Sequence, residues 1–195
     1  MTDLVLLVIG AALINNFVLI RFLGLCPFFG VSRNVETAIG MSMAVVFVMT
    51  LAGSVSWIIF NMVLVPLDIV FLKTIAFILV IASFVQLVEM TIRKVAPTLY
   101  RALGLFLPLI VTNCAVLGVA LISVVESHDF TQAFLFSFGA GLGWALAIII
   151  FAGIRERQEL AEVPNALAGY ANAFITAGLL SIAFFAFSGF PTGSA

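Results

Sequence analysis

The sequence predicts an all-α integral membrane protein with six transmembrane helices in two inverted repeats of three, the first and fourth helices being broken. Hydrophobic residues make up 64% of the chain and charged residues only 9%, against about 25% charged in ordinary soluble domains. Six apolar stretches are long enough to cross a bilayer, and one cysteine motif occurs in each half. We expect a single membrane domain over residues 1–195, with repeats at about 1–98 and 99–195.

The six apolar stretches lie at about 4–31, 38–62, 70–91, 102–125, 130–153 and 170–190. They are continuously apolar, whereas the strands of a membrane barrel alternate between apolar and polar residues, so helices are predicted. The start, MTDLVLLVIGAALINN, has neither the basic region nor the cleavage site of a secretory signal. We therefore expect it to remain as the first helix.

Basic residues indicate the orientation of the helices in the membrane. The connections on one side hold Arg33, Arg93, Lys94, Arg101, Arg155 and Arg157, whereas the other side holds only Lys73. Because basic loops stay in the cytoplasm, both termini are predicted to be periplasmic and the protein to lie in a bacterial inner membrane. The basic residues form no stripe, so a nucleic-acid partner is excluded.

Two of the stretches are expected to be broken. The first, about 28 residues, would measure roughly 42 Å as one helix, more than a bilayer core needs. Gly24, Pro27 and Gly30 are predicted to supply its break, with Pro27 biasing Cys26 away from helical conformation. The fourth stretch contains Pro108 and a polar Thr112-Asn113 pair before Cys114.

The two broken segments resemble each other. LGLCPFFGVS (23–32) aligns with VTNCAVLGVA (111–120), which places Cys26 over Cys114 at a spacing of 88 residues (114 − 26). The same spacing places Ala52-Gly53 over Ala140-Gly141, and a tryptophan follows each pair. Three helices separate the copies, so the second must be inverted. Inverted repeats of this kind place their special site near the midplane, where discontinuous helices meet.

The residues at that meeting point would be Cys26 and Cys114, beside Gly24, Thr112 and Asn113. Three interpretations of the cysteines stay open: small buried hydrophobic residues, a disulfide, or metal ligands. A zinc or iron–sulfur centre normally takes four protein ligands. A metal site would therefore need two more from a second polypeptide.

Other polar residues are interpreted first as structural, while Arg21, as an intramembrane charge, and Glu89, in an ion path, keep a functional role as the alternative. Arg21 lies near the end of a span, where its side chain can reach the interface. Glu89 is placed to pair with Arg93 one turn later. Asn15 and Asn16 are expected to hydrogen-bond between helices or to backbone at the break.

No catalytic constellation is visible in the sequence. His128 lies in a short acidic connection with Glu126 and Asp129, which is typical of a solvated turn. There is no Ser-His-Asp set, phosphate loop or metal-spaced histidine cluster. We expect the chain to carry out no bond chemistry of its own.

The segments NNFVLIRFLGLCPFFGVS (15–32), LGLFLPLIVTNCAVLGVALI (103–122) and FAGIRER (151–157) closely resemble the RnfA family, the A subunits of Rnf electron-transport complexes. The E subunits of the sodium-pumping NADH:quinone oxidoreductases form the sister family. The resemblance covers nearly the whole chain. It implies that Cys26 and Cys114 are two ligands of a [2Fe–2S] cluster, shared with a homologous, oppositely oriented membrane protein, the RnfE component of the complex.

The resemblance implies a function as a non-autonomous subunit of a ferredoxin:NAD oxidoreductase that translocates ions. Its partners would include ferredoxin-like, nucleotide-binding and flavin-bearing subunits. A cluster at the midplane would divide a ~30 Å apolar slab into two electron-transfer steps of about 15 Å. The alternatives are a redox-inactive secondary transporter and a scaffold subunit with the same inverted-repeat fold.

Overall fold

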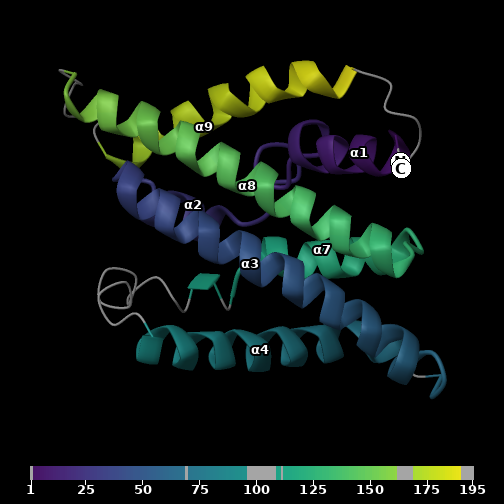
Figure 1. Ribbon diagram of the computed structural model, residues 1–195. Coiled ribbons are helices and arrows are strands. Elements are labelled where there is room, and N and C mark those ends of the chain that lie inside the picture. The colour runs from purple at the N-terminus through teal and green to yellow at the C-terminus, as the bar shows by residue number, and fades with distance from the viewer. Residues whose placement is uncertain (1, 69, 96–108, 111, 162–168, 190–195) are drawn as a thin grey trace.

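The computed structural model describes residues 2–68, 70–95, 109–110, 112–161 and 169–189, and the regular elements in these ranges are all helical (Figure 1). In chain order they are α1 (Thr2–Ile9), the π-helical η1 (Gly10–Ile14), α2 (Leu25–Val31), α3 (Val35–Ile59), the π-helical η2 (Phe60–Leu64), the 3-10 turn η3 (Val70–Leu72), α4 (Lys73–Val95), α7 (Cys114–Val125), α8 (Phe130–Glu159), α9 (Tyr170–Phe185) and the 3-10 turn η4 (Ala186–Gly189).

The long helices α3 and α8 cross at the centre of the molecule and make its most extensive helix contact within the described residues (Figure 1). Small residues permit this crossing. A Cβ on Gly141 of α8 would lie 3.1 Å from the Cα of Val46, and one on Gly53 of α3 would overlap the side chain of Ser137. Close backbone approach through small residues is the usual basis of helix packing in membranes.

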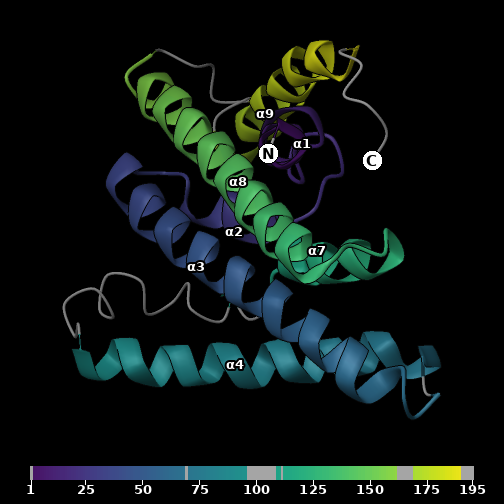
Figure 2. The ribbon, with the colours of Figure 1, turned by 45° about the vertical axis from the view of Figure 1, so that its right-hand side comes forward.

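The remaining helices flank this crossed pair. Helices α1 and α9 lie on one side and α4 on the other (Figures 1 and 2). The outer faces of α4 and α9 are apolar, with large exposed side chains at Ile75, Leu79, Met90, Leu179, Ile182 and Phe185. Such faces suit a lipid surrounding.

Three described helical segments are long and apolar enough to cross a membrane: Val35–Leu64, Val70–Leu87 and Phe130–Glu159. Leu4–Ile14, Cys114–Val125 and Tyr170–Phe185 are shorter apolar helices. Each of these six segments overlaps a different one of the six predicted stretches, and Val35–Leu64 and Phe130–Glu159 extend beyond theirs. In the fourth stretch, residues 102–108, including Pro108, lie outside the described residues.

The break in the first stretch is real, but its position differs from the prediction. The helix stops at Ile14 and resumes at Leu25, so the interruption covers 15–24 and precedes Pro27 and Gly30. Pro27 is the third residue of α2, where a backbone N–H has no partner within the helix in any case. Pro27 therefore fits the start of a helix, and Cys26 is helical, contrary to the prediction.

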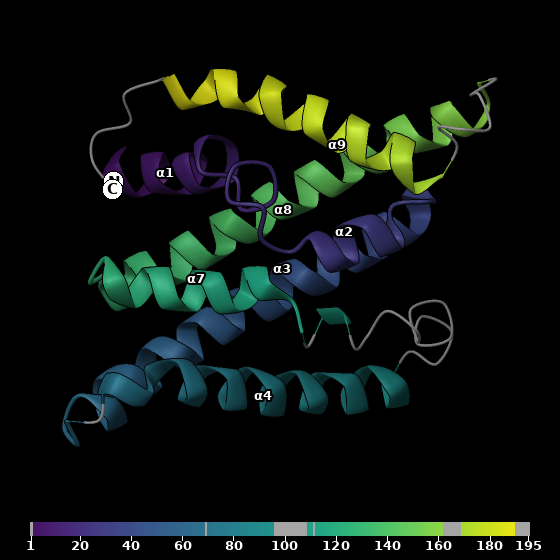
Figure 3. The same cartoon turned by 180° about the vertical axis from the view of Figure 1, so that it is seen from behind.

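Several helix ends lie at one of two sides of the molecule. Helix α3 begins, and α4 and α8 end, at the left of Figure 1, whereas α8 begins and α7 ends at the right. Arg33, Arg93 and Arg157 thus belong to the left end, and Lys73, the first residue of α4, to the right. Arg101 lies outside the described residues. From a common central point, α2 and α7 run in opposite directions (Figure 3).

Candidate functional site

Helix α7 begins at Cys114 because the residue before it is a good cap. Asn113 has extended backbone angles, φ −71° and ψ 109°, and its side-chain Oδ1 accepts a hydrogen bond of 3.0 Å from the N–H of Ala115. An asparagine in this position satisfies an N–H that the first turn leaves without a partner. Asn113 thereby fixes Cys114, which is half-buried, as the first helical residue.

Gly24 brings the first half of the chain to this point. Its backbone N–H donates a hydrogen bond of 2.9 Å to the Sγ of Cys114. Gly24 is buried, with φ +84°, a conformation that favours glycine. A Cβ here would lie 2.8 Å from Nε1 of Trp144 and 3.0 Å from Oδ1 of Asn113. Glycine is thus required both by the backbone angle and by the space.

Cys26 follows two residues later, as the second residue of α2, and its side chain is exposed. The structure therefore brings together three of the residues predicted from sequence, Gly24, Asn113 and Cys114, and Cys26 follows Gly24 by two positions in the chain. Both cysteines are free thiols, and the exposure of Cys26 does not fit a buried packing residue. The fifth, Thr112, lies exposed in the turn before Asn113.

The chemistry available at this place is that of two thiols with amide donors beside them. Within the described residues no group of three or more His, Cys, Asp or Glu side chains could hold a metal ion. The Nδ2 of Asn113 is buried and has no hydrogen-bond partner among the described residues. Two thiolates alone are half of the usual ligand set for an iron–sulfur cluster or structural zinc.

Trp144 is a site residue that the sequence reasoning noted only as part of the repeat. It is fully buried in α8, and its Nε1 lies 3.4 Å from the carbonyl oxygen of Gly24. Trp144 thus contacts Gly24 from the side of α8. The two residues are 120 positions apart in the sequence, so no local sequence pattern reveals this contact.

Asn16 confirms the expectation for an amide at the helix break. It is fully buried, and its Nδ2 donates to the carbonyl oxygens of Gly143 at 2.8 Å and Ala12 at 3.1 Å. Its Oδ1 accepts from the N–H of Val18 at 3.1 Å. One side chain thus binds a carbonyl of η1, an N–H within the break and a carbonyl of α8.

Two charged residues near the helix ends behave differently from each other. Arg21 is exposed, with its guanidinium 5.5 Å from the ring centre of Phe17. The sequence placed Arg155 in the connection after the fifth span. In the structure α8 continues to Glu159, so Arg155 belongs to the helix, and its side chain is buried. The pairing predicted for Glu89 stays a prediction.

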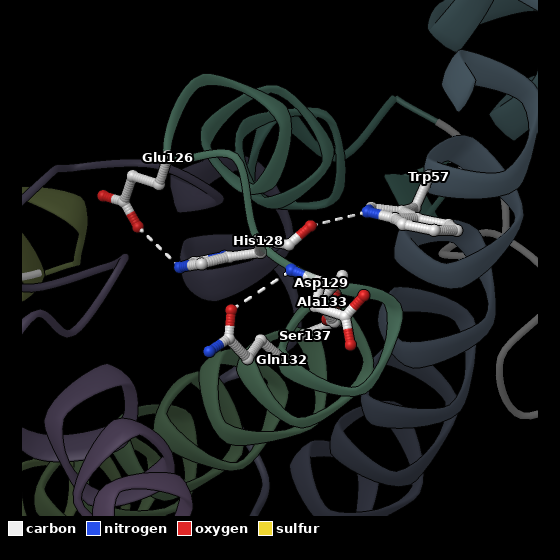
Figure 4. Close-up of polar contacts among 7 residues, drawn as sticks. All are labelled: Trp57, Glu126, His128, Asp129, Gln132, Ala133 and Ser137. Atoms are coloured by element: carbon white, nitrogen blue, oxygen red, sulfur yellow. Dashed lines mark hydrogen bonds and ion pairs between the residues drawn. The ribbon is translucent and has the colours of Figure 1, made fainter.

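His128 does not lie in a solvated turn, as the sequence had suggested. Only 9% of its side chain is exposed, its ring centre is 5.1 Å from that of Phe136, and its Nε2 lies 3.2 Å from Oε2 of Glu126 (Figure 4). The indole N–H of Trp57 also donates to the carbonyl oxygen of His128 at 2.7 Å. This connection is therefore packed against α3 and α8.

Comparisons with known proteins agree on one family. Residues 4–190 match the family model for Rnf-Nqr membrane protein subunits. The chain is 57% identical to the A subunit of the ion-translocating oxidoreductase complex of Photorhabdus laumondii, and 58% identical to the proteins of that name from Cronobacter sakazakii and Aeromonas hydrophila. Each alignment covers 97% of this chain and 98% of the relative.

Proposed function

The chain belongs to the Rnf-Nqr family of membrane protein subunits, and on this premise we propose that it is the A subunit of an ion-translocating oxidoreductase complex. In this role Cys26 and Cys114 supply two of the four thiolates of a [2Fe–2S] cluster within the membrane. The names of the relatives, matched over 97% of the chain, support the assignment to such a complex. When bound, the cluster would accept and release single electrons.

The observation that carries the proposal is the contact between Gly24 and Cys114. Gly24 N–H reaches Cys114 Sγ at 2.9 Å, and Cys26 is only two residues away from Gly24. This proximity supports a site in which thiols from both halves of the chain bind one metal centre. A backbone N–H donated to sulfur stabilises the thiolate form that binds iron. The residues present therefore fit the group.

A second polypeptide completes the ligand set in this proposal. Cys26 is exposed, so a further chain can approach it from the outside. The partner would be a homologous membrane protein of opposite orientation, the RnfE component, which supplies the other two thiolates. The ferredoxin-like, nucleotide-binding and flavin-bearing subunits would deliver and remove electrons.

We also propose six crossings of a bacterial inner membrane in two inverted repeats, with periplasmic termini. The opposite directions of α2 and α7 from a common point support an inverted pair (Figure 3). Arg33, Arg93 and Arg157 belong to helix ends at one end of the molecule, and Lys73 to the other; the excess of basic residues supports a cytoplasmic side at the first end. Discontinuous helices meeting at midplane are the usual place of a transporter's special site.

The test uses the whole complex, purified with this chain unchanged or carrying Cys26→Ser or Cys114→Ser. We expect each serine variant to lose about two iron atoms and the matching labile sulfide per complex, together with one electron paramagnetic resonance signal of the reduced sample. Thr131→Ala, an exposed position of α8, serves as the control and should keep both.

Full iron content and electron transfer in both serine variants would overturn the proposal. That outcome would favour the redox-inactive alternatives, a secondary transporter or a scaffold subunit, in which the two cysteines have no electronic role.

A further inference from the structure

Helix α2 carries Cys26 and cannot hold its own position. It has seven residues, whereas isolated helices shorter than about 12–15 residues are marginal even with favourable sequences. The non-helical segment 15–24 precedes it, and only three residues separate it from α3. The placement of Cys26 therefore depends on contacts that α2 makes with longer helices.

The C-terminal end of α2 is held by a buried arginine of α8. Nη1 of Arg155 donates to the side-chain oxygen of Ser32 at 2.8 Å and to the carbonyl oxygen of Phe29 at 3.2 Å. Arg155 is 8% exposed and Ser32 is fully buried. The carbonyl of Phe29 belongs to the last turn of α2, which has no partners within the helix.

Aromatic stacking adds to this attachment. The ring of Phe28 stacks on Phe151 of α8 with centres 4.5 Å apart, and the Arg155 guanidinium lies 5.8 Å from the centre of the same Phe151 ring. The phenylalanines fix the side of α2 that faces α8. Ring stacking alone would still allow α2 to slide along its own axis, whereas the hydrogen bonds from Arg155 to Phe29 and Ser32 fix the position of the end of α2.

The charge of Arg155 has an unusual environment. Among the described side chains, no carboxylate lies within 4.0 Å of it. The carbonyl end of α2, where the helix dipole is negative, compensates part of the charge, and Glu159, one turn further along α8, attracts it at longer range. Burying a cation without a close ion-pair partner is costly, which points to a specific task at this position.

We propose that Arg155 is a positioning residue, which sets the orientation of α2 and through it the placement of the Cys26 thiol. The inference rests on the proposed function, since its consequence concerns a cluster bound at Cys26. Arg155 contacts the opposite end of α2 from Cys26, so it acts through the helix and does not touch the cluster. Metal ligands require placement within about 0.5 Å, so a loose α2 should impair binding.

The test is hydrogen exchange of the α2 amides in the purified complex, with Arg155→Met, which keeps the apolar stem and removes both hydrogen bonds. We expect exchange of the α2 amides after Pro27, residues 28–31, to become at least about tenfold faster, because loss of even one charge-assisted hydrogen bond produces a change of that size. Arg157→Met on the exposed face of α8 is the matched control and should exchange at the unmodified rate. Arg155→Lys, which keeps the charge, should fall between the two.

A double variant tests whether Arg155 acts through Ser32. If it does, Ser32→Ala should add little to Arg155→Met, because the acceptor has already lost its donor. Unchanged α2 exchange in Arg155→Met would overturn the inference, and so would equal effects of Arg155→Met and Arg157→Met.

The second readout is the electron paramagnetic resonance signal of the cluster that, in the proposed function, binds to Cys26 and Cys114. We expect it to be broadened or reduced in Arg155→Met and unchanged in Arg157→Met. If the unmodified complex lacks this signal, the proposed function fails, while the exchange experiment still decides whether Arg155 positions α2. If the signal is present but identical in both variants, the positioning inference fails and the proposed function stands.

Discussion

At Gly24 the backbone itself is the functional group. Its N–H reaches Cys114 Sγ at 2.9 Å, its carbonyl faces Trp144, and its φ of +84° turns the chain into α2. The sequence predicted Gly24 as part of the break, because glycine before proline and cysteine is a local pattern. Its bond to a residue 90 positions away could not be predicted in that way.

Gly24→Ala should destabilise the folded subunit by roughly 2 kcal/mol or more, since left-handed strain and overpacking each cost about 1 kcal/mol at least. The measurement is the thermal unfolding midpoint of the purified complex. Gly10→Ala is the control, because Gly10 is not among the positive-φ glycines and has no described atom within 4 Å of its Cβ position, so its midpoint should be kept. An unchanged midpoint in Gly24→Ala would contradict this requirement for glycine.

His128 shows the limit of local sequence patterns at the same scale. The acidic residues around it, Glu126 and Asp129, are typical of a solvated turn. The ring is nevertheless covered, because Phe136, two turns along α8, folds back against it. Whether a short connection is buried depends on such tertiary contacts, which neighbouring residues in the sequence do not reveal.

At the scale of elements, α8 organises the fold through its glycines. A Cβ on Gly143 would lie 2.5 Å from the carbonyl oxygen of Ala12, and one on Gly139 would lie 2.9 Å from that of Val8. The glycines are four residues apart, as are Val8 and Ala12, so one face of α8 receives α1 and η1 at backbone distance. The carbonyl of Gly143 also accepts the amide of Asn16.

Gly143→Ala should therefore separate the first helix from α8, with a loss of about 1–3 kcal/mol from overpacking. Gly153→Ala on the same helix has open space around its Cβ position and should be neutral or stabilising by up to about 1 kcal/mol. Denaturant unfolding of the purified protein in detergent compares the two. A Gly143 variant as stable as the Gly153 variant would show that this close contact is absent in solution.

The predicted break illustrates what element-level patterns can and cannot specify. Length alone indicated that residues 4–31 were too long for one span, and the structure agrees. Gly24 lies in the break as predicted, whereas Pro27 and Gly30 lie in α2. Pro27 was wrongly taken as an interruption, because a proline in the first turn loses no helical hydrogen bond. The actual end at Ile14 follows a π-helical turn closed by Asn15 N–H to the carbonyl of Gly10 at 2.7 Å, for which no simple sequence rule exists.

For the whole molecule, the decisive feature is that two short helices from opposite halves begin at one place. The cysteine repeat predicted this meeting point, because inverted copies of a motif have related positions. Helix α2 is held there by Arg155, which the sequence placed in a connection, and by Phe151 of α8, to which the sequence analysis gave no role. Tertiary support of this kind becomes visible only when the helices are placed together.

The most direct test of the central claim is cross-linking of Cys26 to Cys114 in membranes that contain the cluster-free chain. The chain has only these two cysteines, so no other thiol in it competes. Gly24 N contacts Cys114 Sγ at 2.9 Å, and two further residues span at most about 7 Å. A bifunctional thiol reagent of about 10 Å should therefore join the two within one chain, as seen by mass spectrometry of the linked peptides, and neither serine variant should form the product. Efficient labelling of each cysteine separately, without any linked peptide, would contradict the account.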